Sequence, residues 1–149
     1  MTRPLPEART AYRHFGFITT RWMDNDAYAH VNNVVYYAWF DTVVNQYLVE
    51  RGVLDIAKGA VVGLVVETAC NYFSPIAFPD QVHAGLRVAH VGSSSVRYEV
   101  GLFRNEARLA SAQGHFVHVY VDRVSQRPVP LAEGLRAALV PLQTDPPTV

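Results

Sequence analysis

The sequence predicts an α+β fold in which an antiparallel sheet packs against one long helix. Three observations support this prediction: one strand-like segment comes first, one long apolar helix follows, and four long strands come last without helices between them. Strands that follow one another without helical crossovers pair antiparallel. We expect a single domain over residues 1–149, with loosely ordered ends at 1–13 and 141–149.

The helix is predicted over residues 34–51. Asn32 or Asn33 can cap its start with a side-chain oxygen, and Gly52 is a natural stop at its end. The segment 34–40 is apolar or aromatic all round, which is typical of a helix buried on most sides. We therefore expect the sheet to wrap around this helix.

The strands are predicted from apolar runs and from alternation with a period of two residues. The segment 96–102 alternates apolar with polar residues, as a half-buried strand does, and the other runs end at Gly, Ser or Pro. The predicted strands are 15–20, 60–73, 82–91, 96–102 and 115–122, and 131–139 is predicted as a short helix.

The composition excludes several classes of protein. Of 149 residues, 50% are hydrophobic and 17% charged, which excludes a disordered chain. Thirteen basic and 13 acidic residues give no net charge, so nucleic acid is not an expected partner. The lone Cys70 allows no intrachain disulfide. No signal peptide and no apolar run of about 18 residues is visible, so we expect a cytoplasmic protein without a membrane partner.

The apolar excess raises a separate question, because a small domain has a limited interior. Either the core is unusually rich, or a second subunit covers part of the surface. We expect a homodimer or homotetramer, with Asp26 near a subunit boundary.

Two aspartates and a histidine precede the predicted helix: Asp24, Asp26 and His30. The first N–H groups of a helix lack internal partners and carry a partial positive charge. Such donors can stabilise an oxyanion, and a nearby carboxylate can act as base or nucleophile. The same spacing also fits a helix cap and a solvated loop, so both interpretations stay open at this point.

Segment 21–37 carries the pattern Arg-Trp-x-Asp-x-Asp, then His-Val-Asn-Asn-x-x-Tyr-Tyr. In this pattern it resembles the hotdog-fold acyl-CoA thioesterases of the 4-hydroxybenzoyl-CoA thioesterase type. The resemblance covers most of the chain and continues at Tyr72-Phe73-x-Pro75 and Val91-Gly92-x-Ser94-Ser95. It implies a hotdog fold, an antiparallel sheet of about five strands around one long helix.

The resemblance also implies an activity: hydrolysis of an acyl-CoA to a carboxylic acid and free CoA, with no metal and no cofactor. The family's catalytic carboxylate falls on Asp26, and the N–H that polarises the thioester carbonyl falls on Asn33. His30 stands where the aromatic-thioesterase subgroup has a small residue. The sequence is closer to the subgroup associated with fatty acyl thioesters, which leaves the acyl chain open.

Further residues are expected to bind substrate or support the site. Asp24 is expected to order the loop or pair with Arg21. Glu67 lies in an apolar run, so its carboxylate needs a partner or a raised pKa. The arginines can contact CoA phosphates. The predicted substrate-binding or supporting residues are Asp24, His30, Asn32, Tyr36, Glu67, Ser94, Ser95 and Arg97.

Other functions remain as alternatives. A hotdog dehydratase or hydratase would need a histidine with a carboxylate across the site, and His30 with Glu67 is the available pair. A non-catalytic acyl-CoA binding module is the third possibility. No metal site is predicted, because His115 and His118 are three residues apart on one strand and point to opposite faces.

Overall fold

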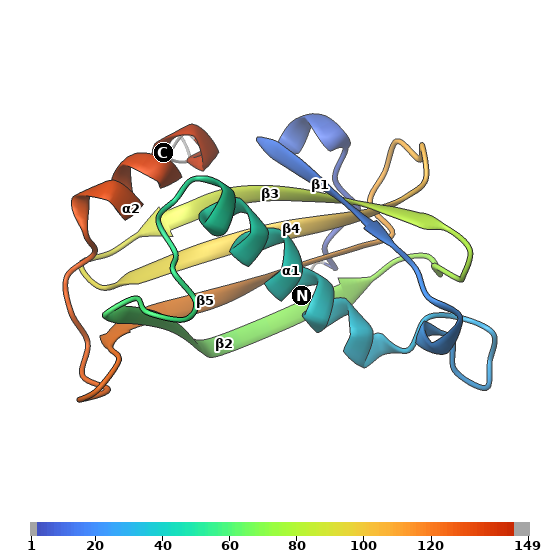
Figure 1. Ribbon diagram of the computed structural model, residues 1–149. Helices are drawn as coiled ribbons and strands as arrows, with labels where there is room; N and C mark the ends of the chain where they lie inside the picture. The colour runs from blue at the N-terminus through green and yellow to red at the C-terminus, as the bar shows by residue number, and fades with distance from the viewer. Residues whose placement is uncertain (1–2, 145–149) are drawn as a thin grey trace.

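The computed structural model describes residues 3–144, and Figure 1 shows their arrangement. Within this part of the chain, five antiparallel strands form one sheet, and the long helix α1 lies across one face of it. The strand order is β1-β3-β4-β5-β2, so β1 and β2 are the two edges. The strands are β1 (His14–Thr19), β2 (Val61–Tyr72), β3 (Gln81–Val91), β4 (Ser95–Arg104) and β5 (Ala112–Asp122), and the helices are α1 (Asn33–Glu50) and α2 (Glu133–Leu139).

This architecture confirms the predicted fold class, and each predicted boundary lies within about three residues of the observed one. The core lies between α1 and the inner face of the sheet. There the rings of Phe40 and Phe116 stack with their centroids 6.1 Å apart. Full burial of one such side chain stabilises the fold by about 1.5–3 kcal/mol.

Helix α1 packs on the sheet through one stripe, not all round. Val34 is 63% exposed and Val49 is 44% exposed on its outward side. The sheet packs against this one long helix, as predicted. The expectation that segment 34–40 is buried on most sides is wrong, because Val34 and Ala38 are exposed. No helix in the described part of the chain is long and apolar enough to cross a membrane. The buried stripe consists of Tyr36, Trp39, Phe40, Val43, Val44, Tyr47 and Leu48.

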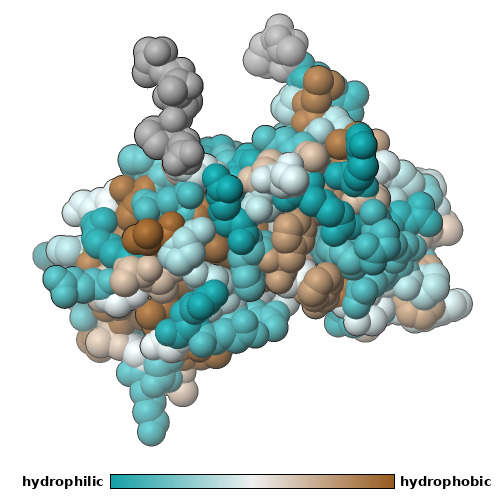
Figure 2. Space-filling view, turned by 90° about the horizontal axis from the view of Figure 1, so that it is seen from above, coloured by the Kyte–Doolittle hydropathy of each residue, from teal (hydrophilic) through white to brown (hydrophobic). Residues whose placement is uncertain are grey.

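Strand β2 is a long edge that is open along its outer side. It has 12 residues, and five of its large hydrophobic side chains are exposed in the single chain. By contrast, the face seen from above in Figure 2, on the side of the other edge strand, β1, mixes hydrophilic and hydrophobic residues. A long apolar edge strand is a template for pairing with another chain. The exposed large hydrophobic residues of β2 are Val61, Leu64, Val65, Val66 and Tyr72.

The N-terminal segment, residues 3–13, lies against the outer face of the sheet, away from α1. Gly85 and Gly101 are direct partners on β3 and β4. Their missing side chains make room for the ring of Tyr12, since a Cβ on Gly101 would lie 2.5 Å from that ring. The segment predicted to be loose is thus held in place where the structure describes it. The sequence did not indicate this, because the two glycines meet only after the strands pair.

The C-terminal end also makes defined contacts. Leu142 is 1% exposed, and the Thr144 N–H donates to the Val88 carbonyl at 3.1 Å. These contacts fall inside the segment 141–149 that was predicted to be loose. The remainder of that prediction, residues 145–149, lies outside the described residues.

Strand β5 points a buried histidine toward α1. His118 is 3% exposed, and the ring of Phe116 lies 4.6 Å away. Neither ring nitrogen of His118 has a hydrogen-bond partner among the described residues. Burial lowers the pKa of His118 from 6.5 to about 4, so the ring is neutral near pH 7. His115 lies on the outer face, so the two histidines point to opposite faces of β5, as the strand period predicted.

We expect the free energy of unfolding to fall by up to about 3 kcal/mol, through His118 alone, as the pH drops from 6.5 to 4. In this window the unfolded chain binds the proton while the folded chain does not, so protonation favours unfolding. Urea titrations of the wild type and of His118→Leu at pH 7, 5.5 and 4.5 measure the effect. The variant should lose less stability on acidification, and identical pH dependence in both proteins would contradict the prediction.

Candidate functional site

The loop between β1 and α1, residues 20–32, is ordered from inside by Asp24, which is 2% exposed. Its Oδ2 accepts the Arg21 backbone N–H at 2.8 Å, and its Oδ1 accepts Arg21 Nη2 at 2.8 Å. The Asp24 carbonyl accepts the Asn32 N–H at 2.9 Å and closes the base of the loop. Asp24 therefore orders the loop and pairs with Arg21, as expected from the sequence.

Asp26 lies in the turn of this loop and lines a surface recess. Its N–H donates to the His30 carbonyl at 2.8 Å, and its Oδ1 accepts the Tyr28 N–H at 2.8 Å. Its Oδ2 has no hydrogen-bond partner among residues 3–144. One carboxylate oxygen thus fixes the turn and the other is open to a ligand. The recess is lined by Trp22, Asn25, Asp26 and Ala29.

The first turn of α1 leaves the Asn33 N–H without an acceptor. Asn32 Oδ1 accepts the Val34 N–H at 3.0 Å, and the Asn32 carbonyl accepts the Val35 N–H at 3.0 Å. The Asn33 N–H has no acceptor within the described chain. Asn32 is therefore the helix cap, as predicted, and Asn33 carries the donor that is free at the positive end of the helix.

The connection between β2 and β3, residues 73–80, supports the loop from outside. The Ile76 carbonyl accepts the Val31 N–H at 2.8 Å. Asn25 Oδ1 accepts the Phe78 N–H at 3.0 Å, and the Phe78 ring lies edge-on to Trp22. Both ends of the loop are therefore fixed, one by Asp24 and one by this connection.

Tyr72, at the end of β2, contacts the start of the helix. Its hydroxyl donates to the Asn33 carbonyl at 3.0 Å, and its ring lies edge-on to Tyr36 with centroids 4.9 Å apart. Tyr36 is 4% exposed and packs in the core. Tyr72 was not among the predicted site residues. Its place directly before a proline-containing turn is the sequence signal that could have indicated it.

His30 and Glu67 lie in different surroundings. His30 is exposed, and its carbonyl supports the turn at Asp26. The Glu67 side chain is 63% exposed on the outer face of β2, and its Oε1 lies 3.5 Å from His115 Nε2. The expected apolar environment of Glu67 is therefore wrong, because β2 is an edge strand with a bulge between Val65 and Glu67.

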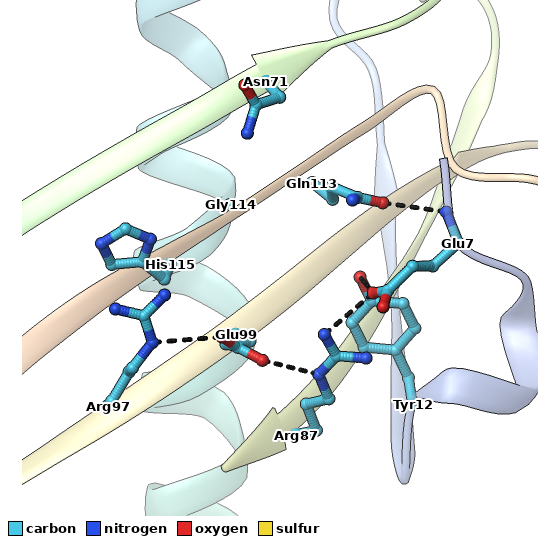
Figure 3. A pocket seen from close by; sticks show the side chains of 9 residues that line it. All are labelled: Glu7, Tyr12, Asn71, Arg87, Arg97, Glu99, Gln113, Gly114 and His115. Carbon is cyan, nitrogen blue, oxygen red and sulfur yellow. Dashed lines mark hydrogen bonds and ion pairs between the residues drawn. The ribbon is translucent and has the colours of Figure 1, made fainter. Parts of the chain in front are cut away.

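Arg97 lies on the outer face of β4, within the network of charged residues in Figure 3. Its Nε donates to Glu99 Oε2 at 3.1 Å, and Arg87 Nε donates to Glu99 Oε1 at 2.8 Å. Burial raises the pKa of Glu99, but the two guanidinium groups lower it by more, so Glu99 stays charged. The charge of Arg97 is compensated here, on the face opposite α1, so this chain does not direct Arg97 toward Asp26.

Ser94 and Ser95 lie at the turn between β3 and β4. The Ser94 carbonyl accepts the Tyr120 N–H at 2.8 Å. Strand β3 starts beside the end of β1, which leads into the loop of Asp26. It then runs 11 residues to this turn, a distance of about 33 Å. A single chain therefore does not bring Ser94 and Ser95 to Asp26.

The fold and the loop at the helix start together define a class of protein, the hotdog-type thioesterases. A family model described as the thioesterase-like superfamily matches residues 20–139. The chain belongs to this superfamily.

Solved structures agree with this assignment. The PA5185 protein of Pseudomonas aeruginosa PAO1 is 55% identical with a TM-score of 0.93, over 96% of this chain and 100% of that one. The PA2801 protein of the same species, named as a candidate thioesterase, is 27% identical with a TM-score of 0.79. The match covers 87% of this chain and 99% of that chain. Slr0204 of Synechocystis, a 1,4-dihydroxy-2-naphthoyl-CoA thioesterase, is 14% identical, and the match covers 84% of this chain and 93% of that chain. Its TM-score of 0.76 shows a shared fold alone.

A curated relative, the uncharacterized protein YsmA of Bacillus subtilis (strain 168), is 24% identical over 93 residues. The match covers 62% of this chain and 63% of YsmA, which is less than two thirds of either.

Proposed function

We propose that the chain hydrolyses an acyl-CoA thioester to a carboxylic acid and free CoA. One observation carries the proposal: the open Oδ2 of Asp26 and the free N–H of Asn33 belong to one loop–helix junction, closed at its base by the bond between Asp24 and Asn32. A carboxylate and a fixed N–H donor are the two groups that thioester hydrolysis needs.

In the proposed reaction the Asn33 N–H donates to the thioester carbonyl oxygen as negative charge develops there. One donor of this kind contributes about 3–4 kcal/mol in the transition state. Asp26 either attacks the carbonyl carbon and forms a mixed anhydride that water then cleaves, or it removes a proton from a water that attacks directly. In both routes the C–S bond breaks, CoA leaves as the thiolate, and the acyl carbon gains an oxygen derived from water.

We propose further that two chains pair through their β2 edges, as a homodimer or as half of a homotetramer. The exposed apolar residues of β2 and its open hydrogen-bonding edge support this. Antiparallel pairing about a two-fold axis would place the Tyr72 end of one copy beside the Val61 end of the other. Ser94 and Ser95 of the second copy, two strands in from that end, would then approach the loop of Asp26.

Thiol release tests the proposed activity. Wild type and Asp26→Ala are assayed over a panel of straight-chain, branched and aromatic acyl-CoA substrates. We expect thiol release by the wild type alone, with acyl-CoA binding retained in Asp26→Ala. Tight binding without turnover in the wild type would indicate an acyl-CoA binding module, and loss of the conjugated absorbance of an enoyl-CoA without thiol release would indicate a hydratase.

A further inference from the structure

One hydrogen bond joins the edge strand β2 to the first turn of α1. The Tyr72 hydroxyl donates to the Asn33 carbonyl at 3.0 Å, although the two residues are 39 positions apart in the sequence. The edge-on contact with Tyr36 holds the Tyr72 ring in place. The bond therefore comes from a side chain that packs on one side against Tyr36 and is 36% exposed in the single chain.

This bond acts on the residue that carries the free donor. In the regular helix the Asn33 carbonyl already accepts from Tyr37, four residues on, so Tyr72 is a second donor to it. The next N–H, that of Val34, is held by the Asn32 side chain. The peptide group that follows Asn33 is thus held at both its oxygen and its nitrogen. The Asn33 N–H belongs to the preceding peptide group, whose oxygen accepts the Val35 N–H at 3.0 Å, so the bond from Tyr72 acts on this N–H through the Asn33 Cα.

The Tyr72 hydroxyl remains a donor under working conditions. Burial raises its pKa above the ordinary tyrosine value, with a smaller contribution from the nearby Cys70 thiol. Burial also raises the pKa of Cys70, to about 11. Both groups therefore keep their protons near neutral pH, and the Tyr72 hydroxyl can donate to Asn33.

We propose that Tyr72 is a positioning residue that aligns the Asn33 N–H with the thioester carbonyl. Tyr72 acts through the helix and does not touch the reacting atoms. The inference rests on the proposed thioesterase function. Strand β2, which we expect at the subunit contact, is also the strand that carries Tyr72. The subunit contact and the alignment of the Asn33 N–H are therefore connected through one strand.

The test compares Tyr72→Phe with Tyr47→Phe. Each removes one hydroxyl that donates to a backbone carbonyl. Tyr47 lies in the second half of α1, and its hydroxyl donates to the Ala138 carbonyl in α2 at 2.6 Å. We expect Tyr72→Phe to lower kcat about tenfold with KM within twofold, because a small misalignment of the donor weakens transition-state stabilisation. Tyr47→Phe should lower thermal stability and leave kcat unchanged.

A second readout does not depend on turnover. The NMR order parameter of the Asn33 N–H should be about 0.85 in the wild type and in Tyr47→Phe, and should fall toward 0.6 in Tyr72→Phe. An unchanged order parameter, an unchanged kcat, an increase in KM alone, or equal losses of kcat in both variants would each overturn the inference. If the wild type hydrolyses no acyl-CoA, the proposed function fails, and the order parameter still decides whether Tyr72 positions Asn33.

Discussion

Replacing Asp26 with asparagine is expected to lower kcat for acyl-CoA hydrolysis by about 10²–10⁴-fold, the range that a positioned base contributes. Asparagine keeps the size of the side chain and an oxygen that can accept the Tyr28 N–H, which Asp26 Oδ1 accepts now. The loop should therefore keep its shape while the negative charge is lost. Thiol-release kinetics measure the loss. We expect KM to stay within about threefold, because in the proposed reaction Asp26 acts on the thioester and is not needed to bind the acyl group or CoA.

Asp24→Asn is the matched control, since it removes the other carboxylate of the same loop. Asp24 is buried and paired with Arg21, so this change should mainly lower stability, by about 3 kcal/mol. Urea titration measures the stability of each variant. Wild-type kcat in Asp26→Asn would show that the assignment of Asp26 is wrong, and a loss of kcat confined to Asp24→Asn would move the chemistry to Asp24.

Lysine at two positions of β2, Leu64 and Val66, is expected to convert the dimer that we propose to a monomer. A standard protein interface buries about 800 Å² on each partner, and charged side chains on an edge strand oppose edge-to-edge pairing. Sedimentation velocity at micromolar concentration measures the change in mass. We expect hydrolysis to fall in parallel, because the site at Asp26 would lose the neighbouring copy.

Thr19→Lys provides the control for this experiment, since it adds a charge to an exposed position of the opposite edge strand, β1. It should leave both mass and activity unchanged. A wild-type protein that sediments as a monomer, or a Leu64→Lys/Val66→Lys protein that stays dimeric, would contradict pairing through β2. If Thr19→Lys alone dissociates the protein, the subunit contact lies on the β1 edge and not on β2.

The elements of the fold were predictable because each depends on local pattern. The helix has an asparagine cap and ends before Gly52, and the strands alternate or form apolar runs. The candidate site was predictable for a similar reason: Asp24, Asp26 and Asn33 are close in sequence and need only one loop to bring them together.

The surroundings of the other predicted site residues depend on which strands become neighbours. The sequence does not contain that information in a local pattern. Glu67 was expected in apolar surroundings, but β2 is an edge strand and its outer face is open. Arg97 and Ser94 belong to strand and turn positions that were correctly predicted, yet their distance from Asp26 follows from the strand order. Tyr72 was overlooked because its partner lies 39 residues away.

The packing of Tyr12 against two paired glycines bears on how this family can vary. A side chain at Gly85 or Gly101 would occupy the space of the Tyr12 ring, with contacts of 2.8 Å and 2.5 Å from the added Cβ. Substitution of Gly101, whose added Cβ would meet only the outer atoms of the Tyr12 ring, is therefore tolerated only after residue 12 has become small. At Gly85 the added Cβ would also lie 2.8 Å from the Tyr12 Cβ and 3.1 Å from the Phe15 ring, so a small residue at 12 does not by itself make room there. Positions 12 and 101 are therefore expected to show epistasis, and homologues should differ at both positions or at neither.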